Sequence, residues 1–335
     1  MNLQGDFILH AAASLCTTPE RVSIENIDWQ DQSLSITAGR DTKLLEASIA
    51  RCGLVQPLIL APKRDGRGYR IVCGMLRVKA LIACGIPECE ARVVASSVSE
   101  EQLALAALYD NVPHRDFNAI EKARGAALLA RVFPPAVALQ LGTELLSLPA
   151  TRDALRRYLE LAQAEELIQN LVLQGAVSVE IACALMRMEA HDREHFISLF
   201  SRLHFSSSKQ AEILDFCADI SRRDNVAISW VLSTPPIAEL LSNVQKQNAA
   251  QIAEQVRQHI RALRFPNLTA SEQRFRELRN ELRLPSTIML EPPPFFEGTE
   301  VRLSFRVRST DELRTLAHHV AALAEHPRLK AWFEE

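Results

Sequence analysis

The pattern of apolar and polar positions divides the chain into a mixed N-terminal part, a long helical middle and a mixed C-terminal part. In the first part, residues 43–52 carry apolar side chains at helical spacing and stop at Gly53, a common helix terminator. Short apolar runs bounded by turn residues such as Asp65 and Gly66 indicate strands. We predict strands at 54–61, 69–73 and 92–95 and a second helix at 75–83.

From Ser99 onward, apolar residues recur at helical spacing with few interruptions. Ser99 with Gln102, and Asn118 with Glu121, have the spacing of capping boxes, in which two side chains satisfy free backbone amides at a helix start. Prolines separate the successive segments. We predict helices at 99–110, 118–132, 136–146, 150–161, 163–173, 177–188, 192–203, 207–222 and 226–232.

The last hundred residues return to mixed character. Residues 236–265 are polar and helical and are interpreted as a linker helix. After it we predict a helix at 271–283, an alternating strand from Glu300 to Arg308 and a final helix at 310–325. The predicted fold class is α+β, with an N-terminal α/β domain, an all-helical middle domain and a small C-terminal α/β module. The domains are placed at 18–97, 98–235 and 266–335, with the linker at 236–265.

Composition narrows the class of protein. The 335 residues are 47% hydrophobic and 24% charged, which is typical of a globular chain of two or three domains and excludes a mainly disordered one. The 38 basic and 41 acidic residues give a net charge of −3, which excludes a uniformly basic nucleic-acid-binding coat but not a local basic face. Seven cysteines without a CxxC pair indicate a reducing cytoplasm rather than a zinc site, a disulfide framework or a redox cofactor.

Two other classes of protein are disfavoured by local patterns. The N-terminus lacks the basic start of a secretion signal, and the apolar stretch 126–148 is interrupted by charges and prolines, so we expect no membrane association. His191 and His195 share a helical face, but no HExxH pattern is present, and exposed histidines are favoured over zinc ligands.

The turn at Gly74 is a candidate anion site on physical grounds. A strand ends at this glycine and a helix begins, so the amides of Met75, Leu76 and Arg77 are free at the helix start. Glycine permits close approach of a ligand, and Arg77 can add a bidentate phosphate contact. The alternative is an ordinary strand–helix turn with a surface arginine.

Three stretches resemble the ParB family of chromosome and plasmid partition proteins. Residues 45–57 (LEASIARCGLVQP) carry its L-x-x-S-I and G-L-x-Q-P elements. Residues 69–80 (YRIVCGMLRVKA) lie where that family has a strand, Gly-Glu-Arg-Arg and a helix, and 110–123 (DNVPHRDFNAIEKA) are similar to its E-N-x-x-R-x-D-L-N-x-I-E-x-A. The resemblance covers about residues 20–190. It implies a ParB/sulfiredoxin-like N-terminal domain followed by a helix-turn-helix DNA-binding domain.

The resemblance also implies a pocket for CTP and magnesium. Asp110 and Asn111 would be the magnesium ligands, as hard oxygen donors, with helix capping or a solvated turn as the alternative. The implied nucleotide-binding residues are Gln56, Gly74, Met75, Leu76, Arg77, His114 and Arg115.

This sequence departs from the family pattern at charged positions. Gly-Glu-Arg-Arg is replaced by residues 74–77 (GMLR), and the family's Gln-Arg by Pro113-His114, with Arg115 one place later. Because such groups stabilise transition-state charge, we expect weak or absent CTP hydrolysis. Sulfiredoxin, which shares the fold, has its nucleophile in a Gly-Cys-His-Arg turn. Met75 stands at that position here, and Cys73 is expected to point into the core.

Residues 134–161 suit a helix-turn-helix with a second helix from Arg152 to Leu161. Thr151 is placed at a phosphate, and Arg152, Arg156 and Tyr158 towards a major groove. The acidic residues of 149–168 outnumber its arginines, so an ordinary helical hairpin remains the alternative. The residues predicted to bind DNA are Thr151, Arg152, Arg156 and Arg157.

A second basic stretch lies at 256–283. It contains seven arginines and three glutamates. Tracking of a phosphate backbone and a solvated, ion-paired face are equally favoured there.

The first hypothesis is therefore a bacterial ParB-like, DNA-binding partition protein regulated by CTP and magnesium. It would be a cytoplasmic, nucleoid-associated homodimer that binds double-stranded DNA and a partner ATPase of the partition type. The second is a divergent regulator or protein-interaction module with a degenerate pocket. An enzyme on this fold ranks last, because no paired catalytic carboxylates lie near Gly74 in the sequence.

Overall fold

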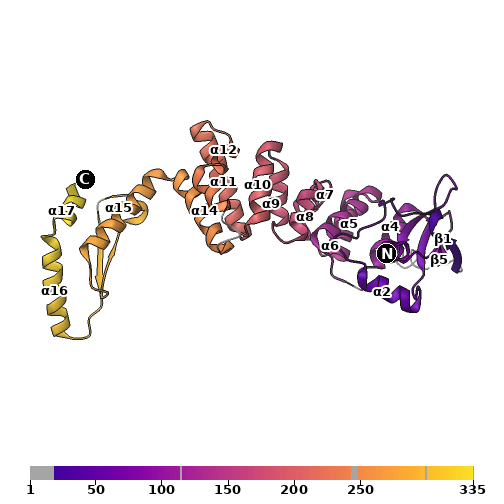
Figure 1. Cartoon of the computed structure of the whole chain (residues 1–335), viewed down its shortest axis with the longest axis horizontal. Helices are drawn as coiled ribbons and strands as arrows, with labels where there is room; N and C mark the ends of the chain where they lie inside the picture. The colour runs from indigo at the N-terminus through magenta and orange to yellow at the C-terminus, as the bar shows by residue number, and fades with distance from the viewer. Residues whose placement is uncertain (1–18, 114, 243–247, 299, 335) are drawn as a thin grey trace. The chain divides into compact units, whose positions relative to one another are not determined.

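The computed structural model describes residues 19–113, 115–242, 248–298 and 300–334. The chain forms two compact units, Met1–Gln210 and Ala211–Glu335 (Figure 1). The first unit contains the larger sheet and the helices up to residue 202, and the second contains the remaining helices and a small hairpin. No helix in the described ranges is long and apolar enough to cross a membrane.

The first unit opens with a five-stranded mixed sheet in the order β1-β5-β3-β4-β2. Strands β3 and β4 form an antiparallel hairpin, whereas β5 runs parallel to β3 after the chain has passed through α3. The core between the sheet and helices α2 and α3 contains aliphatic residues such as Leu58, Leu60 and Val78. The elements are β1 (Pro19–Ser23), η1 (Ile24–Asn26), β2 (Ile27–Asp28), α2 (Lys43–Cys52), β3 (Leu58–Pro62), β4 (Tyr69–Cys73), α3 (Met75–Ala83) and β5 (Glu88–Val93).

Gly74 makes the sharp junction between β4 and α3. Its φ is 103°, in the left-handed region that L side chains rarely adopt. A Cβ at this position would lie 2.8 Å from Cδ2 of Leu58 and 2.9 Å from Nε of Arg77. Only glycine therefore allows the Arg77 side chain to fold back over the start of its own helix.

Seven helices complete the first unit. Both predicted capping boxes are present, at Ser99–Gln102 and at Asn118–Glu121. A second core joins α4 to α7 with Leu34 and Ile36 of the loop that precedes α2. The helices are α4 (Glu100–Tyr109), α5 (Ala119–Val132), α6 (Pro135–Leu146), α7 (Arg152–Ala162), α8 (Glu166–Leu173), α9 (Val179–Met186) and α10 (Ala190–Arg202).

The second unit begins within a long helix and ends in a small α/β module. Helix α14 buries Ile252, Val256 and Ile260, so part of the segment interpreted as a linker packs into this unit. Strand β6 pairs antiparallel with β7. The elements are α11 (Ser207–Asp224), α12 (Ile228–Leu232), α13 (Pro235–Ser242), α14 (Ala249–Arg264), α15 (Pro266–Leu282), β6 (Ile288–Glu291), η2 (Pro294–Phe296), β7 (Arg302–Phe305), α16 (Thr310–Ala324) and α17 (Pro327–Glu334).

The predicted α+β fold class, with an N-terminal α/β part followed by a mostly helical body, is confirmed. The bounds predicted for 43–52, 69–73 and 75–83 are those observed. Two strand predictions were wrong at their ends: β3 begins at Leu58 rather than at residue 54, and β5 spans Glu88–Val93 rather than 92–95, because residues 88–92 pair with β1. The domain boundaries stay predictions.

Candidate functional site

A cavity of about 240 Å³ lies where β4 ends and α3 begins. The loop before α2 and the last turn of α4 close its other sides. The structure thus brings together every residue predicted for nucleotide and magnesium except His114, which lies outside the described residues. Those lining the cavity are Gln56, Gly74, Met75, Leu76, Arg77, Asp110, Asn111 and Arg115.

Arg77 occupies the corner of this cavity and already has partners. Its Nη1 donates to the carbonyl oxygens of Gln56 and Pro57, at 3.1 and 2.8 Å. Its Nη2 lies 3.6 Å from Oδ2 of Asp110, and the side chain is 14% exposed. The guanidinium therefore links the loop before β3, helix α3 and the end of α4. It would have to exchange carbonyl partners to reach a ligand.

The two residues after Gly74 contribute differently from Arg77. The Met75 side chain is buried in the core beneath the sheet, and Leu76 is half-buried. Met75 can therefore reach the cavity only with its backbone amide, one of the free donors at the start of α3. The anion-binding elements left at the corner are amides rather than the charged side chains of the family's Gly-Glu-Arg-Arg.

Arg115 and Ser35 bring unused donors to the same cavity. Nη2 of Arg115 donates to Oγ1 of Thr37 at 3.1 Å and lies 3.2 Å from Oε1 of Glu121. Its Nε is buried and has no partner among the described residues, and neither has Oγ of Ser35. Because an unpartnered buried polar atom is costly, both atoms are candidates to bind a polar ligand.

Glu121 is the charged residue of this region that sequence reasoning missed, apart from its capping role. It is fully buried and accepts two hydrogen bonds from Arg40, both at 2.7 Å. Burial opposes its ionisation, but the hydrogen bonds from Arg40 and the charge of Arg115 hold the pKa of Glu121 below its ordinary value. No spacing rule could have paired it with Arg40, because the two residues are 81 positions apart.

The donors of Asp110 and Asn111 fit a magnesium ion that keeps several waters. Nδ2 of Asn111 donates to the carbonyl of Ala107 at 2.8 Å, so the amide oxygen is the side-chain atom that could coordinate a metal. Asp110 is the last residue capping α4 and retains partial exposure. One carboxylate and one amide oxygen are hard ligands, of the kind magnesium takes together with substrate phosphates.

Cys73 is expected in the core, and the structure confirms this position. It is 2% exposed, and its Sγ donates to the carbonyl of Ala106 at 3.6 Å. Burial raises the pKa of the thiol, so the nucleophilic thiolate is disfavoured.

Comparison with known sequences matches this part of the chain to one family. Residues 15–112 match the ParB N-terminal domain. This part of the chain is therefore similar to the N-terminal domain of the ParB family. It is 30% identical over 170 residues to the chromosome-partitioning protein ParB of Myxococcus xanthus, covering 50% of this chain and 54% of that protein. It is 32% identical over 158 residues to the chromosome-partitioning protein Spo0J of Thermus thermophilus, covering 47% and 55%. The chain thus matches about half the length of these relatives.

A solved ParB structure shows a weaker likeness. The C-terminally truncated chromosome-partitioning protein ParB from Caulobacter crescentus, complexed with CTP-γ-S, is 18% identical. The match covers 55% of this chain and 99% of that one, with a TM-score of 0.27.

Helices α6 and α7 follow the ParB domain and form the predicted helical pair. Thr151 caps α7, because its Oγ1 accepts from the amide of Ala154 at 3.1 Å. Arg152 and Arg156 are exposed four residues apart, on one face of the helix. Tyr158, expected at a DNA groove, instead packs against the core of the first unit.

The arginines of α7 are partly neutralised by neighbouring carboxylates. Arg156 pairs with Asp153 at 2.5 Å and with Glu160. Arg157 pairs with Asp153 and lies 3.4 Å from Glu180 of α9. The DNA-contacting roles of Thr151, Arg152, Arg156 and Arg157 stay predictions.

The first three arginines of the second basic stretch, Arg257, Arg261 and Arg264, are ion-paired within their own unit. Arg257 pairs with Glu212 and Glu254, at 2.7 and 2.8 Å. Arg261 pairs with Glu272, and Arg264 with Asp219, at 2.9 and 2.8 Å. These contacts favour the ion-paired face over a phosphate-tracking surface.

The histidine pair on α10 forms an edge-to-face ring contact. The centroids of His191 and His195 are 4.8 Å apart. In the part of the chain that the structure describes, no three His, Cys, Asp or Glu side chains are placed to hold a metal ion.

Proposed function

We propose that this chain is a DNA-binding partition protein of the ParB type, whose first unit binds CTP with magnesium. The observation that carries the proposal is the convergence of eight predicted residues, far apart in sequence, on one cavity. The match to the ParB N-terminal domain supports the partition role, and the relatives named above are chromosome-partitioning proteins.

The cavity offers a triphosphate several complementary donors. Free amides at the start of α3 face an anion, and Nε of Arg115 and Oγ of Ser35 supply buried hydrogen-bond donors without partners. Asp110 and Asn111 would hold magnesium, which supplies positive charge to the phosphates when bound. Hydrolysis is expected to be weak or absent, because Met75 and Leu76 replace two charged groups of the family pattern.

The DNA-binding half of the proposal lies in α6 and α7. We assign phosphate and groove contacts to Thr151, Arg152, Arg156 and Arg157, on double-stranded DNA. In line with the family, the functional form is a homodimer in the bacterial cytoplasm, associated with the nucleoid and with a partner ATPase.

A second candidate function is a ParB-like regulator with a degenerate pocket. The contacts of Arg77 with the carbonyl oxygens of Gln56 and Pro57 favour it, because they already use the guanidinium that a phosphate would need. The two candidates differ in whether any nucleotide binds.

Calorimetric and thermal-shift titration with the four ribonucleoside triphosphates and magnesium separates these candidates. A ligand at 100 times its Kd should stabilise the first unit by about 2.7 kcal/mol. We expect saturable binding of CTP that Arg115→Ala weakens by about tenfold, the factor for ~1.4 kcal/mol. Arg67→Ala, at an exposed position outside the cavity, is the control and leaves binding unchanged. No shift with any nucleotide would leave only the second candidate.

A further inference from the structure

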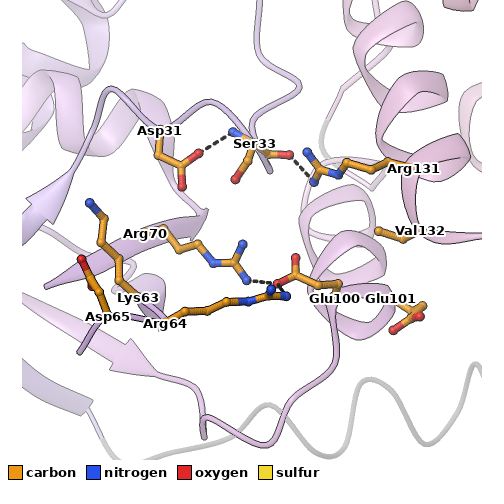
Figure 2. A pocket seen from close by; sticks show the side chains of 10 residues that line it. All are labelled: Asp31, Ser33, Lys63, Arg64, Asp65, Arg70, Glu100, Glu101, Arg131 and Val132. Atoms are coloured by element: carbon orange, nitrogen blue, oxygen red, sulfur yellow. Dashed lines mark hydrogen bonds and ion pairs between the residues drawn. The ribbon is translucent and has the colours of Figure 1, made fainter. Parts of the chain in front are cut away.

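A second and larger hollow, of about 650 Å³, lies on the other side of the loop before α2. Asp31 and Ser33 of that loop face this hollow, whereas residues 34–37 line the nucleotide cavity. Figure 2 shows its walls, which come from the β3–β4 hairpin, the start of α4 and the end of α5. Its lining is strongly charged. The residues are Asp31, Ser33, Lys63, Arg64, Asp65, Arg70, Glu100, Glu101, Arg131 and Val132.

Glu100 is the carboxylate on which two arginines of this hollow converge. Its carboxylate lies 2.5 Å from Nη2 of Arg70 and 3.4 Å from Nη2 of Arg64, and both guanidinium groups point towards it in Figure 2. The hydrogen bond from Arg70, with the charges of Arg64 and Arg131, holds the pKa of Glu100 below its ordinary value. A single carboxylate therefore pairs with two guanidinium groups and also feels the charge of a third, Arg131.

Arg131 and Lys63 show how this charge is distributed. Arg131 donates to the carbonyl of Ser33 at 2.6 Å, so its guanidinium is bound to a neutral group. Lys63 pairs with Asp28 at 2.5 Å and is neutralised by a carboxylate outside the hollow. The hollow is lined by four basic and four acidic residues, but Arg64 and Arg70 share one carboxylate and Arg131 has a neutral partner, so these three guanidinium groups can attract an oxyanion.

The remaining acidic residues of the hollow limit the total negative charge of the ligand that could bind there. Asp31, Asp65 and Glu101 also line the hollow, and their charges oppose a polyanion such as a nucleic-acid backbone. The volume lies in the range of small-molecule pockets. We propose that the hollow binds a small molecule through one phosphate or carboxylate group, which displaces Glu100 from Arg64 and Arg70 and gains Arg131 as a third partner.

The test titrates the full-length chain with inorganic phosphate, acetate, chloride and duplex DNA in separate arms at constant ionic strength. Binding is followed by NMR through the side-chain NεH signals of the arginines. We expect saturable shifts of Arg64, Arg70 and Arg131 with phosphate or acetate but not with chloride, and the arm that saturates identifies the oxyanion. Saturation with neither overturns the proposal. So does a response to duplex DNA alone, because the surface would then be a nucleic-acid contact.

Matched variants separate a built site from general surface charge. Arg64→Ala should weaken binding of the saturating anion at least threefold, whereas Arg67→Ala, an exposed arginine of the same turn outside the hollow, should leave it unchanged. Glu100→Gln removes the internal competitor and should strengthen binding about threefold. Equal losses in the two arginine variants, or weaker binding in Glu100→Gln, would overturn the proposal. Nucleotide binding at the other cavity is not required for any of these outcomes.

Discussion

Arg40 and Glu121 form a two-point ion pair that fastens the loop before α2 to the first turn of α5. Both donor–acceptor distances are 2.7 Å, and Nη2 of Arg40 also donates to the carbonyl of Asp116 at 2.9 Å. The same loop is held by Arg124, which donates to the carbonyl of Thr37 at 2.5 Å. The α/β part and the helical part of the first unit are thus joined through a few buried polar contacts.

Glu121→Ala is expected to lower the free energy of unfolding of the first unit by about 3 kcal/mol, because it leaves the partly buried Arg40 and Arg115 without their carboxylate. Urea denaturation followed by circular dichroism measures the change. Glu194→Ala, at an exposed position, is the control and should change it by no more than about 0.5 kcal/mol. Equal values for the two variants would contradict a structural role for the ion pair.

The stability of the first unit should fall in acid. The pKa of Glu121 is lowered in the folded state, so its contribution is complete above the unfolded carboxyl value of about 4.3 and is lost as the pH falls through the lower folded value. Unfolding free energies measured from pH 6 downwards should therefore decrease. In Glu121→Gln the free energy of unfolding should fall less steeply over the same pH range. An equally steep fall in the variant would argue that Glu121 is not the cause of the acid sensitivity.

Gly74→Ala should lower the stability of the first unit by more than the cost of a side chain at a left-handed φ. The left-handed φ costs a side chain about 1–3 kcal/mol, and the added Cβ would also collide with Leu58 and Arg77. Gly85→Ala is the matched control, because Gly85 also has a positive φ, of 67°, but open space around its Cβ position. Thermal unfolding should show the larger loss for Gly74→Ala, and equal losses would mean that packing at this corner is loose.

If α7 binds DNA as proposed, Asp153→Asn should raise affinity for duplex DNA at low salt. Asp153 pairs with Arg156 and Arg157, and its removal leaves more positive charge on the helix. We expect about a threefold gain, corresponding to an exposed charge interaction of ~0.6 kcal/mol, and a steeper salt dependence. Fluorescence anisotropy measures both. Glu166→Gln makes the same change of charge on α8, away from Arg156 and Arg157. An equal gain in DNA affinity in this variant would argue against direct contact by α7.

Local signals in the sequence predicted much of this fold. Gly74 between a strand and a helix, and the capping boxes at Ser99 and Asn118, depend on neighbouring residues only, and the structure has them where expected. Strand ends depend on partners, so the start of β5 at Glu88 could not be predicted without knowing that residues 88–92 pair with β1. The ion pair of Arg40 with Glu121 was missed for the same reason.

The cavity residues were predicted by their resemblance to a family, but their present contacts were not. Arg77 was expected to face an anion, whereas it is bound to two backbone carbonyl groups. Tyr158 was expected at a groove because its position on α7 was read from the helix alone, without the core of the first unit that buries it. Side-chain orientation depends on packing, which a single sequence does not contain.

Helix α4 reaches both hollows of the first unit, with Glu100 at its beginning and Asp110 just after its end. Ten residues of α-helix span about 15 Å, so a rigid-body shift of α4 would move both of its ends. If a ligand in the charged hollow shifts α4 as it draws Glu100 away from Arg70, Asp110 beside Arg77 moves with the helix. Binding at the two hollows would then be coupled, and each ligand would change the affinity for the other by the same factor.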